Sequence, residues 1–280
     1  MAEDWTLEIK PKRRLLDIDL KGIWRYRDLW YMYVKRDFVT VYKQTILGPL
    51  WFFIQPIFTT VMYMFVFGGL AGISTDGAPK PLFYLSGIML WNYFSECFNG
   101  ASNTFTANAG VFGKIYFPRL IVPLATMTSL LIKLLIQLFL FIAVYLYYLR
   151  AGVNLSLNIT VLLFPVLVLM LAFHALSWGL IVSSLTSKYR DLKYLVGFGL
   201  HLFMYATPII YPLSVASGKI RAILELNPLT PIFEAVKYSC LGCGSFSWVG
   251  LAYSAAVMLV SLFISLIVFN QAERDFLDTV

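Results

Sequence analysis

Charge and reactive side chains are scarce in this sequence. Charged residues make up 13% of its 280 positions, about half of the roughly 25% that soluble domains carry. Hydrophobic residues reach 59%, whereas histidine occurs twice and cysteine three times. Three cysteines are too few for a disulfide framework, and two histidines leave little material for a metal or catalytic centre. The composition therefore indicates a membrane protein and disfavours an ordinary membrane enzyme.

Motifs for nucleotide binding and hydrolysis are also missing. The nearest approach to a phosphate-binding loop is the run from Gly110 to Ile115, GVFGKI. A P-loop needs four residues between its glycines and a Ser or Thr after the lysine, whereas this run has two intervening residues and an isoleucine. The sequence has no G-x-S-x-G, no H-E-x-x-H and no carboxylate pair at helical spacing in an apolar run. We therefore expect no catalytic residue in this chain, and no ATP, metal or other cofactor bound by it.

The cysteines give only a weak signal. Cys240 and Cys243 form one C-x-x-C pair, and Cys97 stands alone. A single pair without a second pair or nearby histidines rarely holds a metal. The spacing favours small structural side chains, with a disulfide as the first alternative and a metal site as the second.

Long apolar runs dominate the rest of the sequence. The stretch from Gln44 to Thr75 contains no Asp, Glu, Lys, Arg or His, and Gly48 and Pro49 break the backbone near its start. Segments of about 20 residues can cross the ~30 Å hydrocarbon core as helices, so we predict an all-α integral membrane protein with six transmembrane helices. The predicted spans are residues 50–70, 83–105, 120–149, 159–186, 194–211 and 248–269.

The sequence divides around these spans. Residues 1–45 are predicted to form a cytoplasmic segment, residues 46–272 a transmembrane domain, and residues 273–280 a cytoplasmic tail. Segment 213–246 is too charged to span and too apolar for a free loop. We expect two short re-entrant helices there, because such segments are too short to cross.

An amphipathic helix is predicted from Gly22 to Phe38. Its apolar residues recur at helical spacing, and most of its charges fall on the other side. A basic helix rich in Trp and Tyr is typical of one lying in the membrane interface. The alternative is a helix packed on a soluble partner or on the protein's own core. The apolar stripe consists of Ile23, Tyr26, Trp30, Val34 and Phe38.

The orientation follows from the distribution of Lys and Arg. With the N-terminus inside, inner segments hold sixteen of these residues, outer segments hold five and one lies in a span. Positive charge is enriched on the cytoplasmic side of membrane proteins, so both termini are predicted to be cytoplasmic. The net charge of +7 is explained in the same way, and we expect no nucleic-acid partner.

Polar residues inside the predicted spans are costly unless they are paired or wetted. Glu96 and Lys133 are both predicted near mid-membrane in consecutive spans, so an intramembrane ion pair is a plausible hypothesis. The alternatives are a lysine that snorkels to the interface and a neutral, hydrogen-bonded glutamic acid. His174 is better explained as a hydrogen-bonding group between helices than as a proton relay.

Aromatic residues make up 17% of the chain. Their flat faces and polar tips suit weak contact with sugar rings, whereas an aromatic belt with ordinary packing is the simpler explanation for any single one. As a set, they make a glycan substrate worth proposing. The candidates for a channel lining are Trp51, Phe52, Tyr63, Phe67, Tyr84, Trp91, Tyr93, Phe198, Phe203 and Tyr205.

Two short elements carry a family resemblance. The first runs from Tyr42 to Pro56 and contains LGPLW, and the second is LNPLTP at residues 226–231. With the surface helix and six spans, the whole chain resembles the permease subunits of type-2 ABC exporters for O-antigen, capsule or teichoic acid polymers. The resemblance implies a homodimer in the bacterial cytoplasmic (inner) membrane, with two copies of a separate ATPase subunit that binds ATP and magnesium.

The resemblance also implies roles for particular segments. The Gly22–Phe38 helix and a coupling segment at 108–119 would contact the ATPase, and the substrate would be a polysaccharide on a polyprenyl diphosphate lipid. The coupling candidates are Asn108, Val111, Phe112, Lys114, Tyr116 and Arg119. The residues expected to attract the lipid diphosphate are Arg25, Arg27, Lys35, Arg36 and Lys43.

Gly48 and Pro49 are a candidate hinge between the surface helix and the first span. Two other functions stay open. One is export of drugs or small lipids by the same fold. The other is an ATPase-independent membrane enzyme or carrier that uses Glu96, Lys133 and His174.

Overall fold

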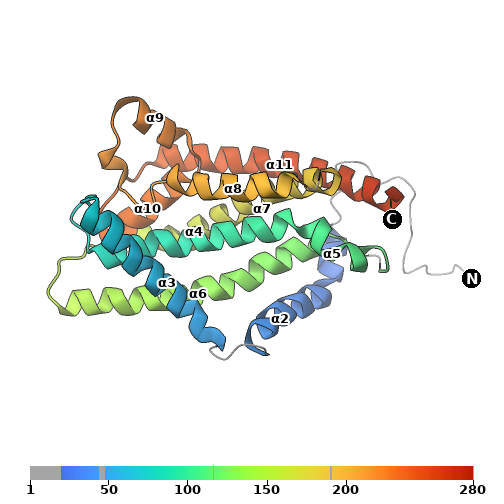
Figure 1. The fold of residues 1–280 in the computed structure, drawn as a ribbon, viewed down its shortest axis with the longest axis horizontal. Helices are drawn as coiled ribbons and strands as arrows, with labels where there is room; N and C mark the ends of the chain where they lie inside the picture. Colours follow the sequence, from blue (N-terminus) through green and yellow to red (C-terminus); the bar gives the residue numbers. More distant parts are fainter. Residues whose placement is uncertain (1–19, 44–47, 116, 190, 280) are drawn as a thin grey trace, which may run out of the picture.

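The computed structural model describes residues 20–43, 48–115, 117–189 and 191–279, and within these ranges it contains helices and no strand. The long helices run along one axis (Figure 1). The elements are α1 (Leu20–Arg25), α2 (Arg27–Lys43), η1 (Gly48–Leu50), α3 (Trp51–Tyr63), η2 (Met64–Leu70), α4 (Lys80–Ser102), α5 (Thr104–Phe112), α6 (Ile121–Arg150), η3 (Ile159–Leu163), α7 (Phe164–Lys188), α8 (Leu192–Tyr205), η4 (Leu213–Val215), α9 (Gly218–Leu226), α10 (Thr230–Leu241) and α11 (Trp248–Thr279).

Among the described residues, four helical segments are long and apolar enough to cross a membrane. The sequence predicts six. The other two predicted spans correspond to α4, whose 23 residues include several polar side chains, and to α8. At ~1.5 Å per residue, the 14 residues of α8 extend about 21 Å, which is less than the ~30 Å core. The four segments are Trp51–Leu70, Ile121–Arg150, Ile159–Lys188 and Trp248–Glu273.

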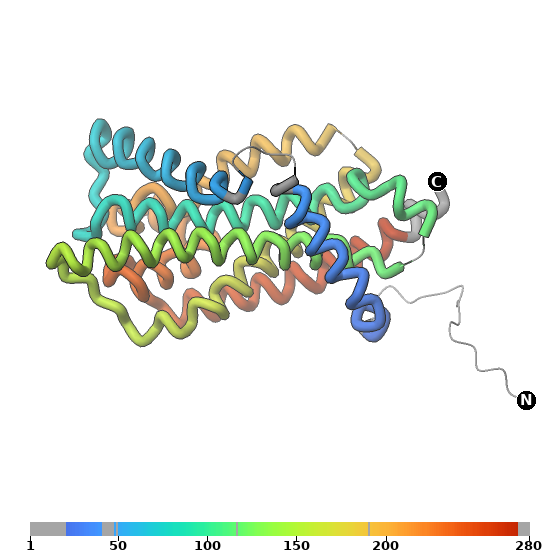
Figure 2. Tube along the Cα trace, turned by 90° about the horizontal axis from the view of Figure 1, so that it is seen from below, coloured from blue at the N-terminus to red at the C-terminus, as the bar shows by residue number. Residues whose placement is uncertain are grey.

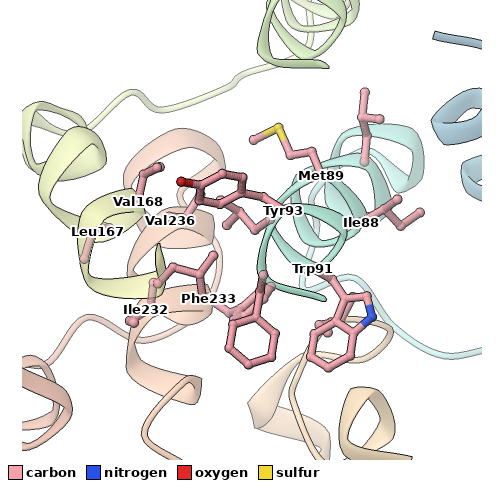
Figure 3. Close-up of a cluster of buried hydrophobic side chains, with 14 of the residues drawn as sticks. Ile88, Met89, Trp91, Tyr93, Leu167, Val168, Ile232, Phe233 and Val236 are labelled. Carbon is pink, nitrogen blue, oxygen red and sulfur yellow. The ribbon is translucent and has the colours of Figure 1, made fainter. Parts of the chain in front are cut away.

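The core is built around α4 and α7. Helix α4 packs against both α6 and α7, and α7 packs against α11 on its other side. Every residue of α4 from Leu82 to Trp91 is buried. Figure 3 shows part of this core, where Tyr93 of α4 lies near Val168 of α7 and Val236 of α10. The residues predicted as span two therefore form the centre of the helical bundle.

Small residues allow the central helices to approach closely. A Cβ added to Gly179 of α7 would lie 2.5 Å from the Ala101 Cβ and 2.8 Å from the Phe98 carbonyl oxygen, both on α4. Likewise, a Cβ on Gly100 would lie 2.6 Å from Thr126 Cγ2 on α6. Membrane helices lack a hydrophobic driving force between them and depend on such close van der Waals contact.

The two ends of the bundle differ. Helices α9 and α10 lie at one end, whereas α2, α5 and the last turns of α11 lie towards the other, here called the α5 end (Figure 1). Two short helices do occur within segment 213–246, at Gly218–Leu226 and Thr230–Leu241. Pro231 in the first turn favours the start of α10, and Gly242, with φ of +71°, ends it.

Candidate functional site

At the α5 end, an aromatic cluster joins α5 to the end of α11. Phe105 stacks on Phe269 of α11 with ring centroids 4.7 Å apart. Arg119 donates a hydrogen bond from its guanidinium to the Glu273 carbonyl oxygen at 3.2 Å. The same guanidinium lies 5.2 Å from the Phe112 ring centroid. These contacts hold α5, and the segment that follows it, against the last helix.

This packing separates the predicted coupling residues into two groups. Phe112 and Arg119 are both 4% exposed, so they connect helices inside the chain itself. Val111 and Lys114 are exposed, whereas Asn108 donates its side-chain amide to the Thr104 carbonyl oxygen at 3.0 Å. Tyr116 lies outside the described residues. The accessible part of this segment also includes Ile115, 62% exposed, an exposed apolar side chain that the sequence analysis did not single out.

The surface helix packs on the protein itself. Ile23 and Tyr33 are buried, and the Trp30 indole donates to Thr128 Oγ1 of α6 at 3.2 Å. Thus α2 lies against the start of α6 (Figure 1), which corresponds to the core-packing alternative for its apolar stripe. Trp24 of α1 and Tyr31 of α2 remain 69% and 67% exposed.

The basic residues predicted to attract a lipid diphosphate lie on the exposed side of α1 and α2. Arg36 contacts Asp37 at 2.8 Å and lies 4.4 Å from the Tyr33 ring centroid, while Arg27 is 4.0 Å from Asp28. The Lys43 side chain lies outside the described residues. Arg25, Arg27, Lys35 and Arg36 are exposed.

The candidate hinge forms a short helical turn between α2 and α3. Gly48 has φ of +47°, a left-handed conformation that favours glycine. No described atom lies within 4 Å of a Cβ built on Gly48, so the requirement for glycine comes from the backbone. Residues 44–47 and the Pro49 side chain lie outside the described part of the chain.

Glu96 of α4 and Lys133 of α6 form an ion pair between Lys133 Nζ and Glu96 Oε1. The Glu96 side chain is 33% exposed and the Lys133 side chain 18%. Lys133 Nζ also lies 5.6 Å from the Phe52 ring centroid on α3. The pair borders a cavity of about 230 Å³, which Asp37 and Phe52 help to line. The structure thus brings the two predicted residues together and connects them to the first span.

His174 links α7 to α11. It is fully buried, and its Nε2 lies 3.2 Å from Ser254 Oγ. One turn further along, Ser177 Oγ and Ser261 Oγ are 3.0 Å apart. These contacts match the predicted hydrogen-bonding role between helices, with no second titratable side chain among the described contacts of His174.

The candidate aromatic residues occupy three environments. Tyr84, Trp91 and Tyr93 are buried in the core of the chain. Tyr63, Phe67, Phe52 and Phe203 are half-buried. Tyr63 donates to Met204 Sδ of α8 at 3.7 Å, and Phe203 lies 6.2 Å from Trp91, centroid to centroid. Among these candidates the exposed rings are Trp51, Phe198 and Tyr205, at 49%, 63% and 57%.

A buried ion pair at the opposite end was missed by the sequence analysis. Lys237 of α10 donates to the Pro208 carbonyl oxygen at 2.5 Å and lies 3.7 Å from Glu234. Glu234 accepts from the Ser245 amide at 3.0 Å. Burial lowers the pKa of Lys237, and Glu234 opposes this shift. The sequence feature that could have revealed this pair is a lysine three residues after a glutamate in an apolar helix, a spacing that brings the two side chains together.

No disulfide joins the three cysteines, all of which lie in the described part of the chain. Cys97, Cys240 and Cys243 are buried and free, so the C-x-x-C pair is not bridged. Within the described residues, no group of three or more His, Cys, Asp and Glu side chains is placed to hold a metal ion.

Comparison with known proteins gives a consistent result. Residues 28–241 match the protein family described as ABC-2 type transporter. The chain is 25% identical to the O-antigen export system permease protein RfbA of Myxococcus xanthus, over 93% of this chain and 98% of that protein. It is 24% identical to an RfbA of Klebsiella pneumoniae, over 89% and 93%. A third relative, the polysialic acid transport protein KpsM of Escherichia coli, is 22% identical over 86% of this chain and 92% of that protein.

Proposed function

This chain belongs to the ABC-2 type transporter family, and from that premise we propose that it is the membrane subunit of an ATP-driven exporter of a cell-surface polysaccharide. The observation that carries the substrate class is the similarity to O-antigen export permeases over about nine-tenths of the chain. We propose a polymer of the O-antigen type, carried on a polyprenyl diphosphate lipid. The sequence has no P-loop, which supports a separate ATPase subunit that binds ATP and magnesium.

The proposed assembly is a homodimer with two ATPase subunits in the bacterial inner membrane. Helix α8 buries none of its 14 residues, all of which are described. It lies with α3 along one edge of the protomer, with α11 on the opposite side (Figure 2). Phe58 of α3 and Phe65 of η2, which continues α3, are 68% and 62% exposed. A second copy placed on this edge would enclose a channel between the α3 and α8 helices. Helix α4, and α8 together with the residues that follow it up to Tyr211, would complete the six predicted crossings of each copy.

The proposed mechanism transmits ATPase movement through two contacts. Val111 and Lys114 of the coupling segment would meet the ATPase at the cytoplasmic surface, together with the exposed side of α2. Arg119 then connects α5 to α11, and the Trp30–Thr128 hydrogen bond connects α2 to α6. Tilting of these helices would open the channel, and the exposed arginines of α1 and α2 would attract the lipid diphosphate.

Deletion of the gene followed by analysis of surface glycan tests the proposal. We expect loss of one surface polymer, its accumulation inside the cell, and ATP hydrolysis by the purified permease–ATPase complex. Full surface glycan together with drug sensitivity or a changed lipid composition would support export of drugs or small lipids instead. Transport that persists without the ATPase would support a carrier using Glu96, Lys133 and His174.

A further inference from the structure

A cavity of about 500 Å³ lies at the α5 end of the bundle, between the start of α8 and the ends of α4, α5 and α7. Its volume is within the ~300–1,000 Å³ range of small-molecule sites. None of its described lining residues borders the Glu96–Lys133 cavity. The proposed orientation places this cavity at the cytoplasmic side, where a substrate made inside the cell would first meet the permease.

Amide and hydroxyl side chains line much of this cavity. Asn99 comes from the end of α4, Asn103 from the junction between α4 and α5, Thr106 from α5, and Thr186 and Ser187 from the end of α7. The hydroxyl groups donate their hydrogen bonds to carbonyl oxygens of nearby residues in the same helical segment. For example, Ser187 Oγ donates to the Ser184 carbonyl oxygen at 2.7 Å. Their oxygen atoms therefore remain available as acceptors. This set of acceptors and amide donors matches the hydroxyl groups of a sugar.

The charge of the cavity favours an anion. Lys193 of α8 is the one charged residue among its described lining residues, and it is exposed. A lysine ammonium forms strong hydrogen bonds with phosphate oxygens. Val182 and Val196 form an apolar part of the cavity wall, which can pack against the ring carbons of a sugar.

We infer that this cavity binds the glycosyl phosphate end of the transported polymer, with the asparagine and hydroxyl side chains on the sugar and Lys193 on the phosphate. The inference rests on the proposed function. It assigns recognition of the substrate to the walls formed by α4, α5, α7 and α8. The aromatic rings of the channel would then contact the polymer only as it passes through.

Gly197 of α8 offers a direct test, because it lines the cavity and no described atom lies within 4 Å of a Cβ built there. A leucine at this position would occupy the cavity without a clash at its Cβ. Gly199 lies two residues further along α8, is equally open at its Cβ, and is not among the described lining residues. Gly199→Leu is therefore a matched control for the same change in helix propensity.

Binding would be measured with the purified permease–ATPase complex in nanodiscs and a synthetic polyprenyl diphosphate that carries a labelled trisaccharide. We expect Gly197→Leu to weaken binding by about tenfold or more, the loss of roughly 1.4 kcal/mol, and Gly199→Leu to bind like the wild type. Lys193→Met should weaken binding, and Lys193→Arg should restore most of it. Equal binding by wild type and Gly197→Leu would overturn the inference and leave the exporter function intact.

A second measurement does not depend on a leucine variant that folds. A photo-crosslinking amino acid would replace Thr106 in the cavity or Phe139, which is 68% exposed on α6. In cells that make the polymer, we expect a glycan-bearing adduct from position 106 and none from position 139. An adduct from neither position in an exporting strain would also overturn the inference. Failure of the wild type to export any glycan would instead contradict the proposed function.

Discussion

The ion pair between Glu96 and Lys133 is the best-defined polar contact between α4 and α6. A partner removed from such a pair leaves an uncompensated charge in a partly buried site, whereas removal of both restores neutrality. The contact between Lys133 and Phe52 also connects the pair to the first span. The pair therefore has a structural role that does not depend on proton movement.

A double-mutant cycle can measure this contact. We expect Glu96→Gln and Lys133→Met each to lower the stability of the protein in detergent by about 1–3 kcal/mol, and the double variant to be less destabilised than their sum. Thermal unfolding with a tryptophan fluorescence readout would give these values. Strict additivity would mean that the two side chains act independently in solution.

At the scale of elements, the Gly48 turn between α2 and α3 determines how the surface helix meets the first span. Its positive φ costs an L-residue about 1–2 kcal/mol, whereas Asn tolerates this region better. We expect Gly48→Leu to insert normally and to export less glycan, and Gly48→Asn to retain more of the activity. Surface-glycan quantification at matched expression would test the order. Full export by Gly48→Leu would mean that this turn only starts α3 and does not act as a hinge.

Helix packing in the centre gives a second prediction at this scale. A methyl group on Gly179 meets α4 at 2.5 Å and 2.8 Å, so Gly179→Ala should overpack the α4–α7 contact and cost about 1–3 kcal/mol. Gly110 in α5 has no described atom within 4 Å of its Cβ position. There the same change should be neutral or slightly stabilising. Melting temperatures of the two variants compare them directly, and equal values would contradict the close packing.

For the whole molecule, the proposed homodimer predicts which surfaces meet. Phe198 on α8 and Phe139 on α6 are 63% and 68% exposed. Of these two helices, α8 lies on the proposed dimer edge and α6 does not. We expect Phe198→Cys to form an oxidised dimer in membranes and Phe139→Cys to remain monomeric. The native cysteines are buried, so they should contribute little background. Denaturing gels without reductant would show the result, and the reverse pattern would place the dimer interface elsewhere.

Much of the architecture was readable from the sequence because apolar runs and charge mark helices in a membrane. The helical segments, the short helices around Pro228 and the juxtaposition of Glu96 with Lys133 all follow from these patterns. The length of α8 could not be predicted from the sequence, because the apolar run continues to Tyr211 whereas the helix ends at Tyr205. Pro208 disfavours helical geometry in the residue before it, and Thr207 bonds back to the Phe203 carbonyl oxygen at 2.9 Å.

The candidate site was less predictable because it depends on contacts between distant segments. Arg119 was predicted to face a partner, yet its guanidinium lies inside, against Phe112 and Glu273. The side chains of the larger cavity come from four helices and carry no shared spacing. Periodicity shows which face of a helix is apolar, and it does not show which neighbour covers that face.

The Glu234–Lys237 pair has a consequence for the biogenesis of the chain. In the proposed orientation α10 lies at the outer side, so both charges must cross the hydrocarbon core during insertion. A single ionised side chain at the centre of a membrane costs several kcal/mol. Because the two residues are one helical turn apart, a nascent α10 helix can carry them across as a nearly neutral unit. Translocation of the outer segment should therefore depend on both residues being present when the chain leaves the insertion machinery.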